Sequence, residues 1–192
     1  MKAGDADTDE EFAACAKTGD RAAFDVLVRR HKDGLYRFVR RYVGDADEAY
    51  DVLQDSFVAA WSGLRRYDPS RPFLPWLRVI ALNKCRDFGR RQTVRRLFLL
   101  AFARENAQAS IRPRTDGETD AAQLQANRLA RLDRAIAQLP KFYKEPLLLT
   151  SVSGLSHQDA AAMLKTTPKA IEMRLYRARR KIQEIMDDGA EG

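Results

Sequence analysis

The stretch Ser156–Lys181, SHQDAAAMLKTTPKAIEMRLYRARRK, predicts a helix-turn-helix that ends in a basic helix. Ser156 is a typical N-cap residue, and Asp159 stands three residues later at the second position of a capping box. Thr167 followed by Pro168 is another start signal, because proline is favoured at the first helical position. We therefore expect two helices separated by a short turn.

The second of these helices carries apolar and basic side chains on different faces. Its apolar residues recur at helical spacing, at Ile171, Leu175, Ala178 and Ile182, and most of its basic residues point the other way. A packed helix behind an exposed basic helix is the arrangement that reads a DNA major groove. A helical hairpin with a merely solvated charged face is the competing interpretation, but two helix starts with positive charge confined to the second helix favour DNA binding.

The composition supports a polyanionic partner and argues against an enzyme. The chain has 192 residues, a formal net charge of +7 and 45% hydrophobic residues, which suits one or two small cored domains. Its two cysteines and two histidines are isolated, so we expect no disulfide scaffold, no metal site and no cofactor. No Ser/His/Asp, Cys/His or Gly-rich phosphate pattern occurs, so no catalytic residues are assigned. Without a signal peptide or an apolar run of about 18 residues, the protein is expected in the cytoplasm without membrane insertion.

Helical periodicity over most of the chain predicts an all-α fold of two small helical domains joined by a flexible linker. The first domain is expected at residues 8–96, the linker at 97–120, and the second domain, which contains the helix-turn-helix, at 121–187. The helices are expected at 10–17, 21–43, from 45 onward, 76–96, 121–139 and 145–152, ahead of the helix-turn-helix.

Three segments of the first half stand out. Residues 65–75, RRYDPSRPFLP, predict a loop because they hold three prolines, and their interleaved basic and aromatic residues suit either a rigid connector or a stacking platform for single-stranded DNA. Residues 97–103, LFLLAFA, are wholly apolar; they either extend the preceding helix into the first domain's core or await a partner. Asp51, Gln54 and Asp55 share one helical face and form an acidic and amide patch in a basic chain.

In its motifs the chain resembles the extracytoplasmic-function sigma factors, the smallest sigma subunits of bacterial RNA polymerase. The first domain matches the family with DVLQDSF at 51–57, YDP at 67–69, WL at 76–77 and IALN at 80–83. The second domain matches with LP at 139–140, LLL at 147–149, GLS at 154–156 and RLYRAR at 174–179. Each motif alone is weak, whereas their order and spacing across two domains make the resemblance specific.

The resemblance implies a sigma factor that binds core RNA polymerase and promoter DNA and is controlled by an anti-sigma factor. It places polymerase binding at Asp51, Gln54 and Asp55. It places recognition of the −10 element at Tyr67, Arg71, Phe73, Trp76, Asn83, Lys84, Asp87, Arg90 and Arg91. It places recognition of the −35 element at Thr167, Lys169, Ala170, Glu172, Met173, Arg174 and Arg177.

A different class of protein remains as the alternative. The helix-turn-helix could belong to a stand-alone transcriptional regulator that binds operators without being a polymerase subunit. Such regulators usually need a dimer that spans two half-sites, or a sensor domain. The N-terminal half shows neither a ligand-pocket signature nor a phosphoacceptor pattern, which favours the sigma factor.

Overall fold

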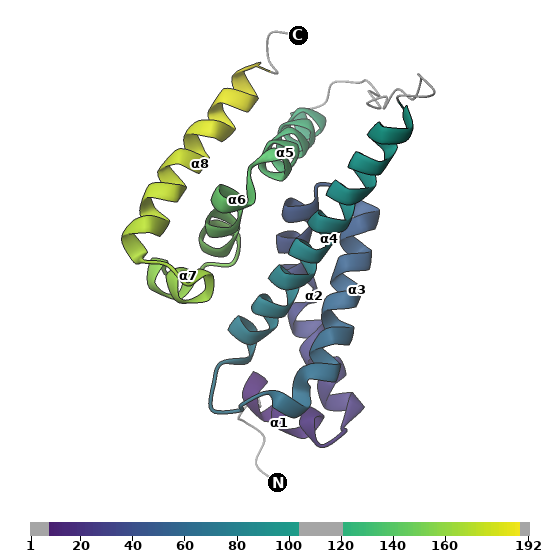
Figure 1. The fold of residues 1–192 in the computed structure, drawn as a ribbon. Helices are drawn as coiled ribbons and strands as arrows, with labels where there is room; N and C mark the ends of the chain where they lie inside the picture. The colour runs from purple at the N-terminus through teal and green to yellow at the C-terminus, as the bar shows by residue number, and fades with distance from the viewer. Residues whose placement is uncertain (1–7, 104–120, 189–192) are drawn as a thin grey trace.

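The computed structural model describes residues 8–103 and 121–188. These two ranges contain eight α-helices and no strand, so the predicted all-α fold is confirmed (Figure 1). The helices form two domains, α1 to α4 and α5 to α8.

The first domain is built around its second helix. Its elements are α1 (Asp9–Lys17), α2 (Arg21–Val43), α3 (Ala46–Gly63), a 3-10 turn (Leu64–Arg66) and α4 (Phe73–Ala103). The predicted boundaries of α2 are confirmed: Asp20 accepts a hydrogen bond from the Ala23 N–H, and Gly44 ends the helix in the left-handed region at φ 92°. Helix α2 contacts α1, α3 and α4, and its buried residues include Leu27, Leu35, Phe38 and Val39.

Helix α4 is longer than the sequence predicted at both ends. It begins at Phe73 rather than Trp76, with Pro75 in the first turn, where a missing N–H costs no intrahelical bond. The Phe73 N–H donates instead to the Glu10 carboxylate of α1 at 2.9 Å.

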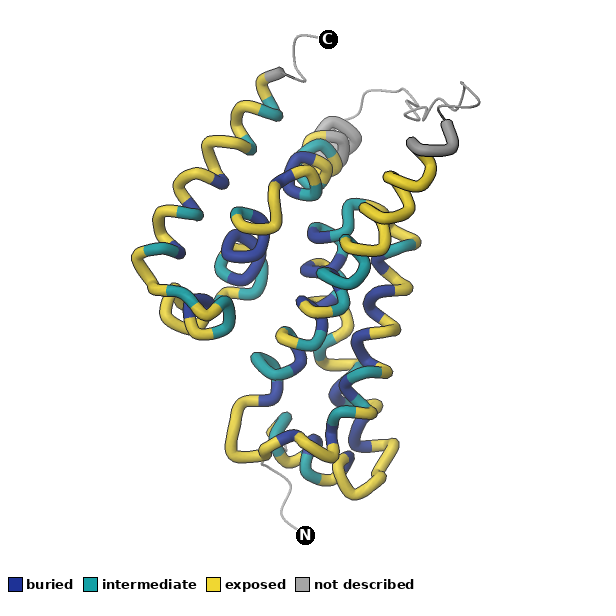
Figure 2. The backbone as a smooth tube through the Cα atoms, in the orientation of Figure 1, coloured by how far each residue is buried: buried dark blue, intermediate teal, exposed yellow. Residues whose placement is uncertain are grey.

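Residues Leu97–Ala103, which we assigned to the linker, continue α4 as its last turns. Burial of this run in the first domain is contradicted, since Leu97 is 62% exposed and Leu99 is 57% exposed. Figure 2 shows this end of α4 as an exposed segment beyond the packed bundle.

The second domain contains the predicted helix-turn-helix. Its elements are α5 (Ala121–Gln138), α6 (Lys141–Leu147), a π-helical turn (Leu148–Val152), α7 (His157–Leu164) and α8 (Pro168–Asp188). Both predicted N-caps form: Ser156 Oγ accepts from the Asp159 N–H at 3.0 Å, and Thr167 Oγ1 accepts from the Ala170 N–H at 3.2 Å. Helix α6 begins four residues earlier than predicted, directly after Pro140.

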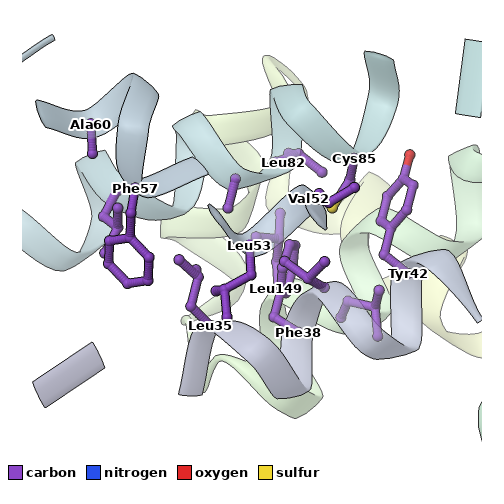
Figure 3. Packing of buried hydrophobic residues seen from close by; sticks show 14 of the residues in the cluster. Leu35, Phe38, Tyr42, Val52, Leu53, Phe57, Ala60, Leu82, Cys85 and Leu149 are labelled. Atoms are coloured by element: carbon purple, nitrogen blue, oxygen red, sulfur yellow. The ribbon is translucent and has the colours of Figure 1, made fainter. Parts of the chain in front are cut away.

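The two domains share a continuous apolar core. Leu149 of the π-helical turn is fully buried and lies with Leu35 and Phe38 of α2 (Figure 3). Helices α5 and α6 lie between α8 and the first domain (Figure 1). At Gly44 the domains approach so closely that an added Cβ would stand 2.7 Å from the Cβ of Ala137. The chain is therefore closed on itself, an arrangement that the expected linker alone did not predict.

Candidate polymerase and nucleic-acid interfaces

The three predicted polymerase-binding residues are all exposed on one side of α3. Asp51, Gln54 and Asp55 point outward because Val52 and Leu53, between them in the sequence, are buried against the bundle. Among the residues that the structure describes, none of these three side chains makes a hydrogen bond or an ion pair, so their polar groups remain available to a partner.

The acidic face of α3 borders the basic side of α4. A groove of about 280 Å³ between these helices is lined by carboxylates and cations together, among them Asp51, Asp55, Lys84 and Arg91. Burial, together with the neighbouring Asp45, raises the pKa of Glu48 in this groove. The predicted polymerase-binding and −10 residues therefore meet at one groove.

Two of the aromatic residues predicted to stack on DNA are core residues instead. Tyr67 is 2% exposed and Phe73 is fully buried, with ring centroids 5.7 Å apart in an edge-on arrangement. The Tyr67 hydroxyl donates to the Arg71 carbonyl at 2.5 Å, and burial raises its pKa to about 12. The prediction that these two rings present a face to a base is wrong here, because they pack inside the domain to hold the loop. Trp76 is only half-buried and keeps exposed surface beside them.

The remaining predicted −10 residues lie on the surface of the loop and α4. Fully exposed are Arg71, Asn83, Arg90 and Arg91; half-buried are Lys84 and Asp87. Asp87 forms an ion pair with Arg90 one turn away. Arg86, which the sequence did not single out, donates to the Asn83 side-chain oxygen at 3.4 Å.

The recognition helix α8 presents most of its predicted contacts to solvent. Exposed are Thr167, Lys169, Glu172, Met173 and Arg177, and half-buried is Ala170. The buried stripe of α8 consists of Ile171, Leu175 and Ala178, as its apolar spacing predicted.

Arg174 is the exception on this helix. Its guanidinium lies 3.8 Å from the centroid of the Phe142 ring of α6, and its Nη2 donates to the Thr166 hydroxyl at 3.4 Å. Its Nε is buried and has no hydrogen-bond partner. Because this side chain packs against α6 and the turn, we remove Arg174 from the predicted base contacts.

A buried polar cluster joins the two domains at Lys144 and Glu145, which are 8% and 7% exposed. The Lys144 ammonium donates to the carbonyl of Tyr42 at 3.2 Å and to that of Ala137. These carbonyls belong to the last turns of α2 and α5, where the helix dipole favours a cation. Burial lowers the pKa of Lys144 to about 8.

Glu145 binds the first domain through α4. Its two carboxylate oxygens accept from Nε and Nη2 of Arg86, at 2.8 and 2.6 Å, and this hydrogen-bonded pair raises the pKa of Arg86. The Tyr42 hydroxyl donates to the same carboxylate at 3.4 Å, and burial raises the pKa of Tyr42. No sequence signal pointed to this cluster, because its members are separated by more than 50 residues along the chain and carry no motif.

Known families match both domains. Sigma-70 region 2 matches residues 27–95, and Sigma-70 region 4 matches residues 129–182. The RNA polymerase sigma factor CnrH of Cupriavidus metallidurans is 37% identical over 193 residues, covering 96% of this chain and 97% of that relative. The RNA polymerase sigma factor NccH of Alcaligenes xylosoxydans is 37% identical, covering 95% and 96%.

A solved structure agrees with these matches. The structure of CnrH in complex with the cytosolic domain of CnrY is similar with a TM-score of 0.67 at 35% identity, covering 95% of this chain and 99% of that one. Region 2 followed by region 4 defines the sigma-70 class, whose members are non-catalytic transcription initiation factors. Within that class, the chain belongs to the extracytoplasmic-function sigma factors of bacterial RNA polymerase.

Two further observations concern other kinds of site. Along residues 8–103 and 121–188, no three metal-ligating side chains come together in a position to hold an ion. Within the same ranges, no helix combines the length and the apolar character needed to span a bilayer.

Proposed function

We propose that this sigma factor acts in the cytoplasm, without catalytic activity of its own, by dividing polymerase and promoter binding among three surfaces. The polymerase surface is Asp51, Gln54 and Asp55 on α3. The −10 surface is the exposed side of the loop at 67–72 and of α4. The −35 surface is the N-terminal half of α8.

The observation that carries this proposal is the separation of charge on the surface. A basic chain exposes an unpaired acidic face on α3, whereas α8 exposes its basic residues on the opposite side of the molecule (Figure 1). A stand-alone regulator has no need of the acidic face, while a polymerase subunit needs one surface for protein and others for DNA.

Transcription from fragmented genomic DNA of the source organism tests the proposal. Purified core RNA polymerase with this protein should yield transcripts that share upstream sequence elements at two fixed spacings. Core enzyme alone is the control. DNA binding without any core-dependent transcript would identify a stand-alone regulator instead.

The exposed residues of α8 are expected to divide into base and phosphate contacts, because only the first turns of a recognition helix usually reach base edges. Substituting Lys169, Glu172 or Met173 by alanine should change which −35 sequences are used. Substituting Arg177 or Arg179 by alanine should weaken binding to every sequence and flatten the salt dependence by about one unit per phosphate contact. Binding to a −35 sequence library at several salt concentrations measures both effects. Equal losses on all sequences from the first group would contradict the division.

We further propose that an anti-sigma factor controls this protein. Two features support this: the fold is similar to that of CnrH, which was solved with the cytosolic domain of CnrY, and the end of α4 exposes an apolar run. Exposed apolar surface of this kind is typical of a protein-binding site.

Replacing Leu97 and Leu99 by serine tests whether this run serves binding or folding. Since both side chains are more than half exposed, the double variant should keep the melting temperature of the wild type within about 2 °C. Thermal unfolding followed by circular dichroism provides the measurement. A large drop in melting temperature would show that the run stabilises the fold and would remove it as a partner site.

A further inference from the structure

We infer that this sigma factor masks one of its own DNA-binding residues: Arg86 belongs to the strand-binding surface of α4, and Glu145 of the second domain occupies it while the domains are closed. This inference rests on the proposed function, because it assumes that α4 binds the promoter strand. It adds a residue to the DNA surface and an internal competitor for it.

The position of Arg86 on α4 places it among the predicted −10 residues. Asn83, Arg86 and Arg90 follow one another at spacings of three and four, so their side chains share one face of the helix. Arg86 already donates to the side-chain oxygen of Asn83, and its own side chain is 34% exposed. A DNA strand that reaches Asn83 would therefore meet this guanidinium next.

The contact between Arg86 and Glu145 uses the groups that a phosphate would use. Nε and Nη2 each donate to a different carboxylate oxygen, at 2.8 and 2.6 Å. This paired edge of the guanidinium binds carboxylates and phosphates with the same two-bond geometry. Glu145 and a backbone phosphate therefore cannot hold that edge at the same time.

Glu145 cannot release Arg86 by a side-chain rotation alone. Its side chain is 9% exposed and is enclosed where α6 meets α2 and α4. The adjacent Lys144 bridges the last turns of α2 and α5, and Arg41 of α2 pairs with Asp133 of α5 at 3.0 Å. Freeing Arg86 therefore requires the second domain to move away from the first.

This coupling links DNA binding to domain opening. A ligand that binds only the open form shifts the equilibrium by its preference for that form, and its apparent affinity falls with the fraction of closed chains. The free protein should bind single-stranded DNA weakly for this reason. Any contact that separates the domains should strengthen that binding.

Glu145→Gln in the full chain tests the inference. The variant loses the charge that pairs with Arg86, so the domains should open and the radius of gyration from small-angle scattering should rise. Affinity for a short fluorescein-labelled single strand of random sequence should increase roughly tenfold, and the salt dependence should steepen by about 0.7, the value for one added phosphate contact on a single strand. Asp133→Asn, which breaks the second ion pair without touching α4, should change both quantities in the same direction.

Matched variants separate this mechanism from a simple change of charge. Asp25→Asn removes one exposed carboxylate that makes no ion pair within the described structure, and it should leave scattering and DNA binding as in the wild type. Arg86→Gln should open the chain like Glu145→Gln but gain no added salt-dependent contact. The inference is overturned if Glu145→Gln and Asp133→Asn, both folded by circular dichroism, keep the compact size and DNA affinity of the wild type. It is equally overturned if Arg86→Gln gains DNA affinity as strongly as Glu145→Gln.

These outcomes are independent of the transcription test. If core-dependent transcripts form but Glu145→Gln behaves as the wild type, the inference fails and the proposed function stands. If no core-dependent transcript forms, the proposed function fails whatever the size of the variant.

Discussion

Replacing both Asp51 and Asp55 by lysine is expected to abolish association with core RNA polymerase. The double substitution turns two exposed negative charges into two positive ones on the face proposed to meet the polymerase. Like charges brought together at an interface cost several kcal/mol, so the Kd should rise by at least about a hundredfold. Titration of labelled protein with purified core enzyme, followed by fluorescence anisotropy, measures the loss.

The control for this experiment makes the same charge change elsewhere. Asp25 and Asp33 are exposed on α2, so replacing both by lysine should leave core binding close to that of the wild type. Neither double variant should unfold, because none of the four side chains is part of the apolar core. Co-purification of the Asp51 and Asp55 variant with core enzyme at the wild-type level would refute the assignment of this face.

Truncating Leu149 to alanine is expected to be the most destabilising of the proposed changes. Leu149 is fully buried where the second domain packs on α2, so the substitution removes buried methyl groups and leaves a cavity. Leucine-to-alanine changes at such sites cost about 2–5 kcal/mol. Urea unfolding followed by circular dichroism gives the change in the free energy of unfolding.

Leu129→Ala serves as the matched control for this stability measurement. Leu129 lies on α5 and is 48% exposed, so its truncation should cost well under about 1 kcal/mol. If the two variants were equally stable, the packing of Leu149 between the domains would not contribute to the stability of the chain.

The sequence predicted those features that depend on neighbours along the chain. Asp20, Ser156 and Thr167 cap helices in the structure as predicted, since an N-cap bonds to an N–H only three residues away. Gly44 ends α2 for an equally local reason, namely its positive φ. The spacing of apolar residues likewise predicted which face of α3 and of α8 is exposed.

Features that depend on distant partners could not be predicted in this way. Tyr67 and Phe73 looked available for stacking because a proline-rich loop is usually exposed, yet α1 covers this loop: Lys17 donates to the Tyr67 carbonyl at 2.8 Å. Arg174 has the sequence position of a base contact, but Phe142, 32 residues earlier in the chain, binds its guanidinium.

The polar cluster between the domains shows the same limit. Lys144 and Glu145 are a lysine and a glutamate in an amphipathic stretch, a pattern typical of a solvated helix surface. Only the fold brings them to Arg86 and to the last turn of α2, where both become buried. The continuation of α4 past Arg96 was missed for a different reason, because a wholly apolar run carries no period that distinguishes a helix from a linker.

The shared core also sets a sequence of events during synthesis of the chain. Phe38 is made well over a hundred residues' worth of helix, loop and linker before Leu149 packs beside it; at roughly 5–20 residues per second, that interval is on the order of ten seconds. Throughout it, the finished first domain presents an uncovered apolar strip of α2 at the ribosome. Nascent chains stalled before α6 should therefore be captured by chaperones or aggregate, while chains released after α8 should not.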